Sequence, residues 1–557
     1  MNEQPHHLPK NRPELSLPLL DRKLVIAHYM TMMTYSKDMR PNESLFDPAT
    51  YGREGPAAHL GGMSQHIPMI AHYYGASATL EESVAHEIRA AVELGVDGFQ
   101  FYFPDRFDPS TRDDACAIII AYLQVAARQF PGFKLTVCPS HPDTLTEEQN
   151  IAEFAVSLNR ILAATRRLDS WLKTPDGRTI IYLWAPETLA DSVTPASQVD
   201  RHPERMVDVA VAYGRLAAAC GLDAAFIYHL RDEWAGNAEL LEEALDYFPA
   251  VWGFVPTSDR GDAWERVHTR CRERGRLYTQ SVFNDFYTSK FHAKNDEWRV
   301  ILQLDECRDG AVADYWKRYL PCGLSASFRR QLQRAVDWDV PIINVVTWND
   351  YPEGHHLAPE INRNFGFALL LKHFKNIWLG RPQDNDREWA AAFYKKYRSD
   401  VRPDPFDFEI RLLREETAEE DVIEVITWLA EPARLQINTT DCGMIAAGLR
   451  ETRIPTEPGH IRVRLERDGR ALLGFETPEA ITDHPFRTDL TTCTFSSECM
   501  SWMRRLFPDE NPIHSTEYAI VQRGEDLHHH DYAADHERAR VAAPVRSSAP
   551  EEQLAHP

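Results

Sequence analysis

The sequence lacks the features that mark several common classes of protein. Its nine cysteines are scattered singly without a Cys-x-x-Cys pair, which excludes a zinc ribbon and a dense disulfide framework. No run approaches the roughly 20 apolar residues that span a bilayer, and residues 1–23 lack the apolar core of a secretory signal. There is no basic block, and a formal net charge of −23 would repel phosphate backbones and anionic lipids. We therefore expect no nucleic-acid or membrane partner and, for the sequence as written, a cytoplasmic protein, with secretion left open.

Several catalytic signatures are also missing. The chain contains no Gly-x-Ser-x-Gly elbow, no His-Glu-x-x-His metal helix and no P-loop. Its first apolar run is followed by Thr31-Met32-Met33-Thr34 rather than by the Gly-rich phosphate turn of a doubly wound sheet. We expect no cofactor, and the chemistry has to rest on carboxylates.

The chain does contain apolar, strand-like runs that alternate with amphipathic helical stretches. Eight such runs, the number that closes a TIM barrel, lie at residues 23–30, 97–103, 133–139, 179–184, 224–230, 250–255, 277–282 and 342–348. The first intervening helix begins with a capping-box pattern, Thr79-Leu80-Glu81-Glu82, and continues with an apolar stripe of Val84, Ile88, Ala91 and Val92. The pattern predicts an α/β fold, a (β/α)8 TIM barrel.

The pattern of apolar residues changes near residue 404. Helical stripes vanish, and short strand-like runs are separated by turn-forming residues, with the hairpin signal Asp468-Gly469 between two of them. We predict a barrel over residues 23–403, followed by a smaller C-terminal β-sandwich domain over 404–523. Residues 1–22 are a predicted N-terminal extension, and 524–557 a predicted disordered tail, because neither has a core-forming pattern.

The most informative segment follows the eighth run. The apolar stretch 342–348 is typical of a strand covered on both faces, and reactive groups lie at the carboxyl ends of such barrel strands. Asp350 and Glu353 come directly after it. Cleavage of a glycosidic bond needs one protonated and one ionised carboxyl group, so this pair is the predicted catalytic site. On an irregular loop the two carboxyls could splay apart to about 6.5–9.5 Å, which would admit a water and favour inversion.

The same two residues have a plainer interpretation. Asp-x-x-Glu is also a helix capping box, in which Asp350 would cap and Glu353 would reach back. However, Gly354 and Pro359 would interrupt a helix that began there, and the next helical stripe begins at Phe365. We therefore favour catalysis over capping.

Other polar and aromatic side chains fall near the predicted strand ends. Rings there could stack on pyranose faces, although core packing explains about half of them equally well. His355 is expected to hold Glu353 or a sugar hydroxyl, and a metal site built on His355 and His356 would need further ligands, so none is predicted. The predicted substrate-binding residues are His28, Asp105, Trp184, Tyr228, Tyr287, Trp348, Tyr351 and His355.

Three segments resemble glycoside hydrolase family 71, the endo-acting α-1,3-glucanases. The run 347–355 is similar to that family's Trp-Asn-Asp-Tyr-Gly-Glu-Ser-His block, Ala27-His28-Tyr29-Met30 to its Ala-His-Phe-Met, and 95–99 to its second-strand motif. The matches span roughly residues 23–380 in the family's order. The resemblance implies a TIM barrel with a β-rich appendage and an inverting mechanism in which Asp350 and Glu353 are the base and the acid, in either order.

The chain departs from the family at several positions. Pro352 and Gly354 replace its Gly and Ser, and the third and fourth runs end in 138–141 and 183–187 rather than in its Phe-Asp and Thr-Phe. The substrate therefore stays open between an α-glucan and the α-mannosides of the related endo-α-mannosidases. A non-catalytic carbohydrate-binding or polysaccharide-assembly protein on the same barrel is a further alternative. The expected partner is a polysaccharide or oligosaccharide, and the oligomeric state is open.

Overall fold

The computed structural model describes residues 19–39, 68–70, 77–103, 109–139, 146–190, 206–255, 263–288, 291–293, 296–301, 315–360, 362–383, 387–401, 409–412, 421–478, 480–483 and 490–507. Asp105, most of the N-terminal extension and the predicted tail lie outside these ranges. Among the helices that are described, none combines the length and the apolar character needed to cross a bilayer.

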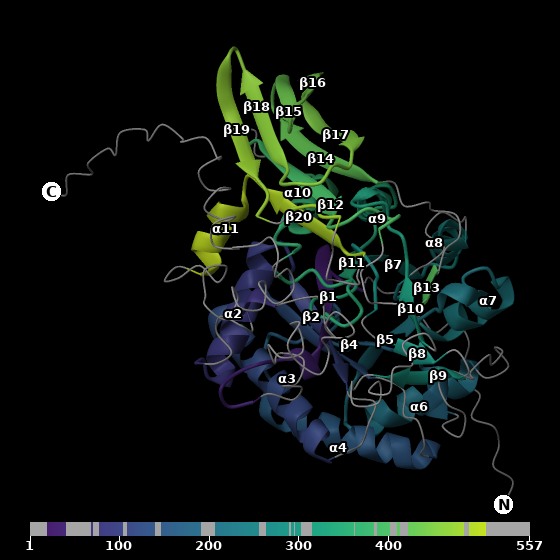
Figure 1. Ribbon diagram of the computed structural model, residues 1–557. Helices are drawn as coiled ribbons and strands as arrows, with labels where there is room; N and C mark the ends of the chain where they lie inside the picture. The colour runs from purple at the N-terminus through teal and green to yellow at the C-terminus, as the bar shows by residue number, and fades with distance from the viewer. Residues whose placement is uncertain are drawn as a thin grey trace, which may run out of the picture.

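Eight parallel strands form the barrel at the centre of the molecule (Figure 1). They are β1 (Leu24–Met30), β2 (Gly98–Phe103), β3 (Lys134–Pro139), β4 (Thr179–Tyr182), β5 (Ala224–His229), β6 (Ala250–Trp252), β7 (Leu277–Val282) and β11 (Ile342–Val345). Their order, β3-β2-β1-β11-β7-β6-β5-β4, places the first strand beside the last. Every predicted run forms one of these strands, so the predicted TIM barrel is confirmed.

A short bridging segment closes the barrel between β3 and β4. Leu172, on the segment that precedes β4, donates its N–H to the carbonyl of Leu135 on β3 (2.8 Å) and accepts the N–H of Ile180 on β4 (3.0 Å). Nearer the carboxyl end, the N–H of Trp184 meets the carbonyl of Pro139 directly (3.3 Å). The two strand edges are thereby joined through hydrogen bonds, as a closed barrel requires.

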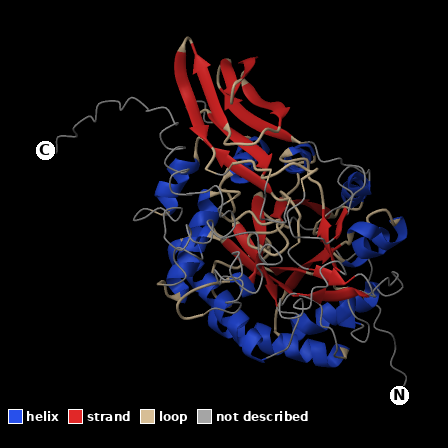
Figure 2. Cartoon of the chain, in the orientation of Figure 1, coloured by secondary structure: helices blue, strands red, loops and turns tan. Residues whose placement is uncertain are grey.

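Helices surround the strands on the outside (Figure 2). They are α2 (Leu80–Glu93), α3 (Pro109–Gln129), α4 (Glu147–Thr165), α5 (Glu187–Ala190), α6 (Met206–Ala219), α7 (Ala238–Tyr247), α8 (Ala263–Glu273), α9 (Ala326–Asp337) and α10 (Gly366–Trp378). The capping box of α2 is formed in both directions: Thr79 accepts from the N–H of Glu82, whose carboxylate accepts from the N–H of Thr79. Val84, Ile88 and Ala91 are buried. Val92 is 49% exposed, because one further residue turns the helix by about 100° toward solvent.

Side chains alternate between the barrel lumen and the helices. Leu24, Ile26 and Ile227 belong to an inner apolar cluster, whereas their chain neighbours pack in the outer cluster with the helices. Across the lumen, the hydroxyl of Tyr182 on β4 donates to Oδ1 of Asn344 on β11 (2.8 Å). This alternation decides which side chains at the strand ends can reach a common site.

Antiparallel sheets follow the barrel. One contains β12 (Trp389–Lys395), β14 (Val422–Leu429), β17 (Gly448–Pro455) and β20 (Thr492–Ser496), and another contains β15 (Ala433–Ile437), β16 (Thr440–Ile445), β18 (Arg462–Arg467) and β19 (Arg470–Glu476). Phe475 of β19 packs on Phe495 of β20 with a ring separation of 5.8 Å, which joins the two sheets. Asp468 and Gly469 both have positive φ in the β18–β19 hairpin, as a type I′ turn requires. The first sheet begins at Trp389, ahead of residue 404.

The described elements not yet named are one further sheet, one helix and two short 3-10 turns. A four-stranded sheet contains β8 (Phe291–Ala293), β9 (Asp296–Ile301), β10 (Tyr315–Tyr319) and β13 (Glu409–Leu412), and α11 (Cys499–Leu506) follows β20. Two short 3-10 turns, Thr31–Met33 and Asp232–Trp234, follow β1 and β5.

A buried ionic junction fastens the C-terminal sheet to the barrel. Asp285, in the segment after β7, accepts the backbone N–H of Thr492 on β20 (2.6 Å). The same carboxylate lies 3.4 Å from a guanidinium nitrogen of Arg363 and 3.8 Å from Nζ of Lys395 on β12, and its side chain is fully buried. One carboxylate therefore balances two buried cations from two parts of the chain.

Replacing this carboxylate tests the junction. We expect Asp285→Ala to lower the free energy of unfolding by about 3–5 kcal/mol, because it removes the buried carboxylate that faces the buried guanidinium of Arg363. Asp113 lies on α3 and is an exposed partner of Arg160 on α4. Asp113→Ala should lower the free energy of unfolding by less than about 1 kcal/mol. Urea unfolding of both variants measures the difference, and equal losses would contradict the role given to Asp285.

Candidate active site

The loop after β11 folds back on itself at the carboxyl end of the barrel. The N–H of Thr347 donates to the carbonyl of His355 (3.0 Å), and its Oγ1 accepts the N–H of Asp350 (2.8 Å). The peptide bond between Val346 and Thr347 is cis. Asn349 pairs with the backbone of Met30 on β1, accepting its N–H (2.7 Å) and donating to its carbonyl (3.1 Å). The loop is thus fixed both to itself and to the neighbouring strand.

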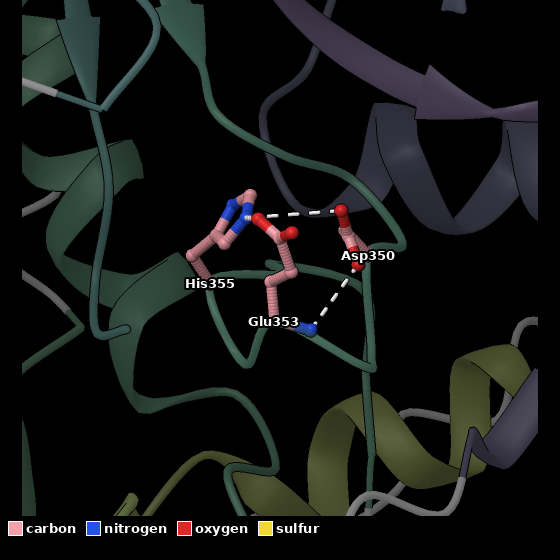
Figure 3. A group of neighbouring side chains, drawn as sticks. All are labelled: Asp350, Glu353 and His355. Atoms are coloured by element: carbon pink, nitrogen blue, oxygen red, sulfur yellow. Dashed lines mark hydrogen bonds and ion pairs between the residues drawn. The ribbon is translucent and has the colours of Figure 1, made fainter. Parts of the chain in front are cut away.

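Two carboxylates and one imidazole converge within this loop (Figure 3). Nε2 of His355 lies 3.2 Å from Oε2 of Glu353 and 3.8 Å from Oδ2 of Asp350. The side chain of His355 is fully buried, that of Asp350 is 7% exposed and that of Glu353 is 22% exposed. We refer to Asp350 and Glu353 as the acid pair. Both acids face the same nitrogen, Nε2 of His355. An atom bound between them therefore contacts all three groups.

Half of the capping interaction weighed from the sequence is present. Oδ1 of Asp350 accepts the backbone N–H of Glu353 (3.2 Å). The Glu353 carboxylate hydrogen-bonds to His355, and residues 351–354 form turns rather than a helix. A hydrogen bond donated to a carboxylate favours its ionised form, so this contact stabilises the charge of Asp350.

The separation of the acid pair differs from the predicted one. One oxygen of each acid and one nitrogen of His355 all lie within 4.8 Å of one another. Inverting glycosidases hold their carboxyls about 6.5–9.5 Å apart to admit a water, whereas retaining ones hold them about 5–5.5 Å apart. The nearest oxygens of the two acids are therefore closer together than the predicted separation, because both side chains turn inward to the same imidazole.

Aromatic rings fix the plane of His355. Its ring stacks on Phe286, with centres 5.6 Å apart and planes 12° apart, and meets the edge of Phe254 at 5.6 Å. Its Nδ1 is buried and has no hydrogen-bond partner in the described part of the chain. Nε2 is thus the nitrogen that faces the acid pair.

A wall of rings continues from Phe254 across the lumen. It comprises His28, Trp184, His229, Trp252 and Phe254, which we call the aromatic wall. Trp184 stacks on His229 at 4.5 Å and meets Phe254 at 4.2 Å, and His28 lies 5.2 Å from Phe254. These rings come from β1, β6 and the carboxyl ends of β4 and β5, so they line the side of the barrel that faces the acid pair.

The histidines of this wall are uncharged near neutral pH. Burial lowers the pKa of His28 to about 3; a hydrogen bond with Gln100 and the charge of Glu353 oppose the shift, and His355 adds to it. Burial likewise lowers the pKa of His229 well below its usual value, helped by Arg231 and His28. Neutral imidazoles keep the wall apolar enough to pack while leaving ring nitrogens for hydrogen bonds.

The structure brings together five of the predicted site residues: Asp350, Glu353, His355, His28 and Trp184. Tyr228 is not among them. Its hydroxyl hydrogen-bonds to Glu187 and its ring stacks on Phe248 at 5.0 Å, on the helix side of β5. The alternation of the strand points His229, one residue later, toward the lumen, so His229 and not Tyr228 joins the aromatic wall.

Trp348 and Tyr351 also lie away from the acid pair. Nε1 of Trp348 donates to Glu87 on α2 (2.8 Å), and its ring is 5.4 Å from Phe99. Tyr351 packs against the ring of His356 at 4.6 Å, in the outer apolar cluster. The strand ends at Val345, so its alternation no longer orients these two residues.

Tyr287 contributes through its backbone rather than its ring. Its N–H donates to the carbonyl of Glu353 (3.1 Å), which helps to position that acid. Its ring lies against Tyr319 at 5.7 Å and 5.6 Å from Nζ of Lys317. Asp105 lies outside the described residues.

Sequence reasoning missed His229, Phe254 and Phe286. His229 follows Ala225 and Ile227 with a period of two, a signal that was present on β5. Phe254 continues the same parity from Ala250 and Trp252 on β6. Phe286 lies on an irregular segment, where no periodicity points to it.

The same three donors could also hold a cation. Two carboxylate oxygens and one imidazole nitrogen within 4.8 Å of one another suit a divalent metal ion. The expectation of no metal rested on His355 and His356 alone, without Asp350 and Glu353 as ligands.

Comparison with known proteins gives distant similarities. No protein-family model and no curated protein matches the chain. Similar solved structures include a family 99 endo-α-mannosidase from Bacteroides thetaiotaomicron (11% identity, 64% of this chain and 98% of that chain, TM-score 0.41). Others are a glycoside hydrolase-like protein (13%, 68% and 98%, TM-score 0.40) and a double mutant of an endo-β-1,4-mannanase from Cellulomonas fimi (10%, 85% and 93%, TM-score 0.34). These distant similarities are to the barrels of glycoside hydrolases, and they do not assign this chain to a family.

Glu87 on α2 accepts a hydrogen bond from Trp348 and so helps to hold the site loop. The pH dependence of stability tests its protonation state. Burial raises the pKa of Glu87 to about 7, while the hydrogen bond from Trp348 lowers it. The unfolded chain releases this proton near pH 4.5 and the folded chain near pH 7, so the folded state binds more protons in between. Stability therefore falls as pH rises through this window.

Glu87→Gln removes this titration and keeps an acceptor for Trp348. Relative to wild type, its unfolding free energy should rise by up to about 3 kcal/mol between about pH 4.5 and about pH 8. Urea unfolding at both pH values measures this change. Glu81→Gln, at an exposed position of α2, should show no such rise, and a pH-independent difference for Glu87→Gln would contradict the buried, protonated state.

Proposed function

We propose that the protein is a glycoside hydrolase that cleaves an α-linked glycan, with Asp350 and Glu353 as its catalytic carboxylates. The observation that carries this proposal is the convergence of both acids on Nε2 of His355 at the carboxyl end of the barrel. The aromatic wall beside them supplies flat, apolar faces on which pyranose rings stack. The TIM barrel places its reactive groups at this same end.

The contacts of the acid pair divide the two roles. Asp350 is the more buried acid and accepts a backbone N–H, which favours a negative charge at the anomeric carbon. Glu353 is more exposed and can take up a proton from solvent between turnovers, so we assign to it the donation of a proton to the glycosidic oxygen. His355 contacts both carboxylates and holds them in place. The resemblance to family 71 did not decide which of the two residues is the acid, and this division assigns that role to Glu353.

A two-step reaction fits the short separation. Glu353 protonates the leaving oxygen while the Asp350 carboxylate bonds to the anomeric carbon and the glycosidic bond breaks. A water then attacks the same carbon, its proton passes to Glu353 and the bond to Asp350 breaks. Both carboxylates return to their starting states, and the product keeps the configuration of the substrate.

Substitution of each acid tests these assignments. We expect Asp350→Asn and Glu353→Gln each to lower kcat on α-mannan or α-1,3-glucan by about 10²–10⁴-fold. On an aryl glycoside whose leaving group needs no proton, Glu353→Gln should keep most of its kcat/KM, which reports the first step, while its kcat stays low because the second step still needs Glu353 as a base. Asp350→Asn should lose both. Reducing-end release measures turnover, and Asp113→Asn serves as an exposed-carboxylate control.

The same assay separates the alternatives. Activity should persist in EDTA, whereas a metal-dependent hydrolase that uses the acid pair as ligands would lose it. Glycan binding without reducing-end release by the wild-type chain would identify a non-catalytic binding protein and refute the proposal. Wild-type rates in both variants would refute the site, and preference between the two polymers identifies the sugar.

The stereochemistry of the product is a separate prediction. Proton NMR of the first-formed hemiacetal should show retention, because the acid pair lies too close to hold a water between its carboxyls. Inversion, which the family 71 resemblance implies, would show that the reacting acids separate by about 2 Å or more when substrate binds.

A further inference from the structure

A pocket lies outside the barrel, where α10 meets the C-terminal sheet. It has a volume of about 260 Å³ and is lined by residues of α10, β12, β14 and α11 and of the segment that leads to β12. None of its lining residues belongs to the acid pair or to the aromatic wall. The pocket is therefore a site distinct from the candidate active site.

Three tryptophans contribute to this pocket. Trp389 and Trp502 are almost completely buried, whereas Trp428 on β14 is partly exposed. The ring of Trp428 lies 4.9 Å from the ring of His373 on α10, and that of Trp389 lies 6.3 Å from it. Trp428 thus offers a ring to a ligand, while the other two support it. A flat indole that is half covered by protein is suited to stack on the apolar face of a sugar.

His373 supplies one buried ring nitrogen that has no hydrogen bond within the described residues, while its side chain also interacts with Gln383. Its Nδ1 is buried and makes no hydrogen bond to any described residue. Burial also lowers the pKa of His373 to about 4, so the ring is neutral near pH 7. A buried nitrogen without a hydrogen bond is unfavourable, and a ligand hydroxyl that reaches it would remove this penalty.

The charged groups of the pocket already have partners. A guanidinium nitrogen of Arg387 lies 2.8 Å from Oε2 of Glu498. Nζ of Lys372 donates to the carbonyl of Glu93 (2.8 Å) and lies 5.4 Å from the ring centre of Trp502. Since the Arg387 charge is matched by a carboxylate and Lys372 is engaged, the pocket favours a neutral ligand with hydroxyl groups over an anion.

We propose that this pocket binds a pyranose unit of a glycan and holds the chain to the protein away from the acid pair. The identity of that glycan as the substrate rests on the proposed function. A stacking ring, a buried acceptor or donor and paired charges together match a neutral sugar. Engagement at two points of one polymer raises the local concentration of glycosidic bonds at the active site.

Filling the pocket tests the proposal without removing a core side chain. Asn376 lines the pocket on α10, and Ile377, the next residue, is exposed outside it. In a Glu353→Gln background that prevents turnover, Asn376→Trp and Trp428→Ala should weaken binding of oligosaccharides from α-mannan or α-1,3-glucan about tenfold. Ile377→Trp is the matched control and should bind as the parent does. Isothermal titration calorimetry measures the affinity and the number of sites.

Kinetics on the active enzyme supply the second readout. With Glu353 in place, Asn376→Trp should raise KM for the polymer about tenfold and leave kcat on a short aryl glycoside unchanged, because only a long chain reaches both sites. Trp428→Ala should act likewise. If Trp428→Ala fails to fold, Asn376→Trp alone decides, since its position is on the helix surface.

The outcomes distinguish the two proposals. Unchanged oligosaccharide binding and unchanged KM in Asn376→Trp would overturn the pocket proposal even if the acid pair is catalytic. Loss of a sugar-binding site in Asn376→Trp would support it even if the wild-type chain hydrolyses neither polymer. Pocket-dependent binding of inorganic phosphate or sulfate, without binding of sugar, would also overturn it.

Discussion

The geometry of the acid pair depends on the buried contact between Asp285 and Arg363. Arg363 lies between the carboxylate of Asp285 and the backbone of the site loop, and its Nη1 donates to the carbonyl of His356 (3.3 Å). Asn284 donates to the same carbonyl (2.7 Å). His355, the residue before His356, is the histidine on which both acids converge. Because β20 binds Asp285 through Thr492, the C-terminal sheet helps to support the site loop and is not a separate module.

Low polarity around the acid pair strengthens its electrostatics. Phe254 and Phe286 cover the two sides of His355, and the neutral His28 and His229 add rings without adding charge. Charges and dipoles act over longer distances in such surroundings than in water.

Local sequence signals predicted the fold because they act over a few residues. The eight apolar runs, the capping box at Thr79 and the Asp468-Gly469 turn each needed only neighbours in the chain. The acid pair could be proposed from the sequence because reactive groups lie at the carboxyl ends of barrel strands, and its catalytic role stays a prediction. The choice of Tyr228 over His229 depended on a one-residue parity, and the distance between the acids depended on where His355 lies. The pocket at Trp428 unites residues from 369 to 502, so no local pattern could show it.

The hydrogen bond from Tyr182 to Asn344 has a consequence for how far a ligand can enter. Asn344 also donates to Thr279 (2.7 Å), so three side chains from β4, β7 and β11 tie the interior together. Asn344 pairs in register with Ile26, two residues below His28, which makes this tie the floor beneath the aromatic wall. A sugar bound as we propose would therefore meet the protein above that floor, at the rings and the loops. The loops would then set which glycan is bound, while the interior framework stays constant.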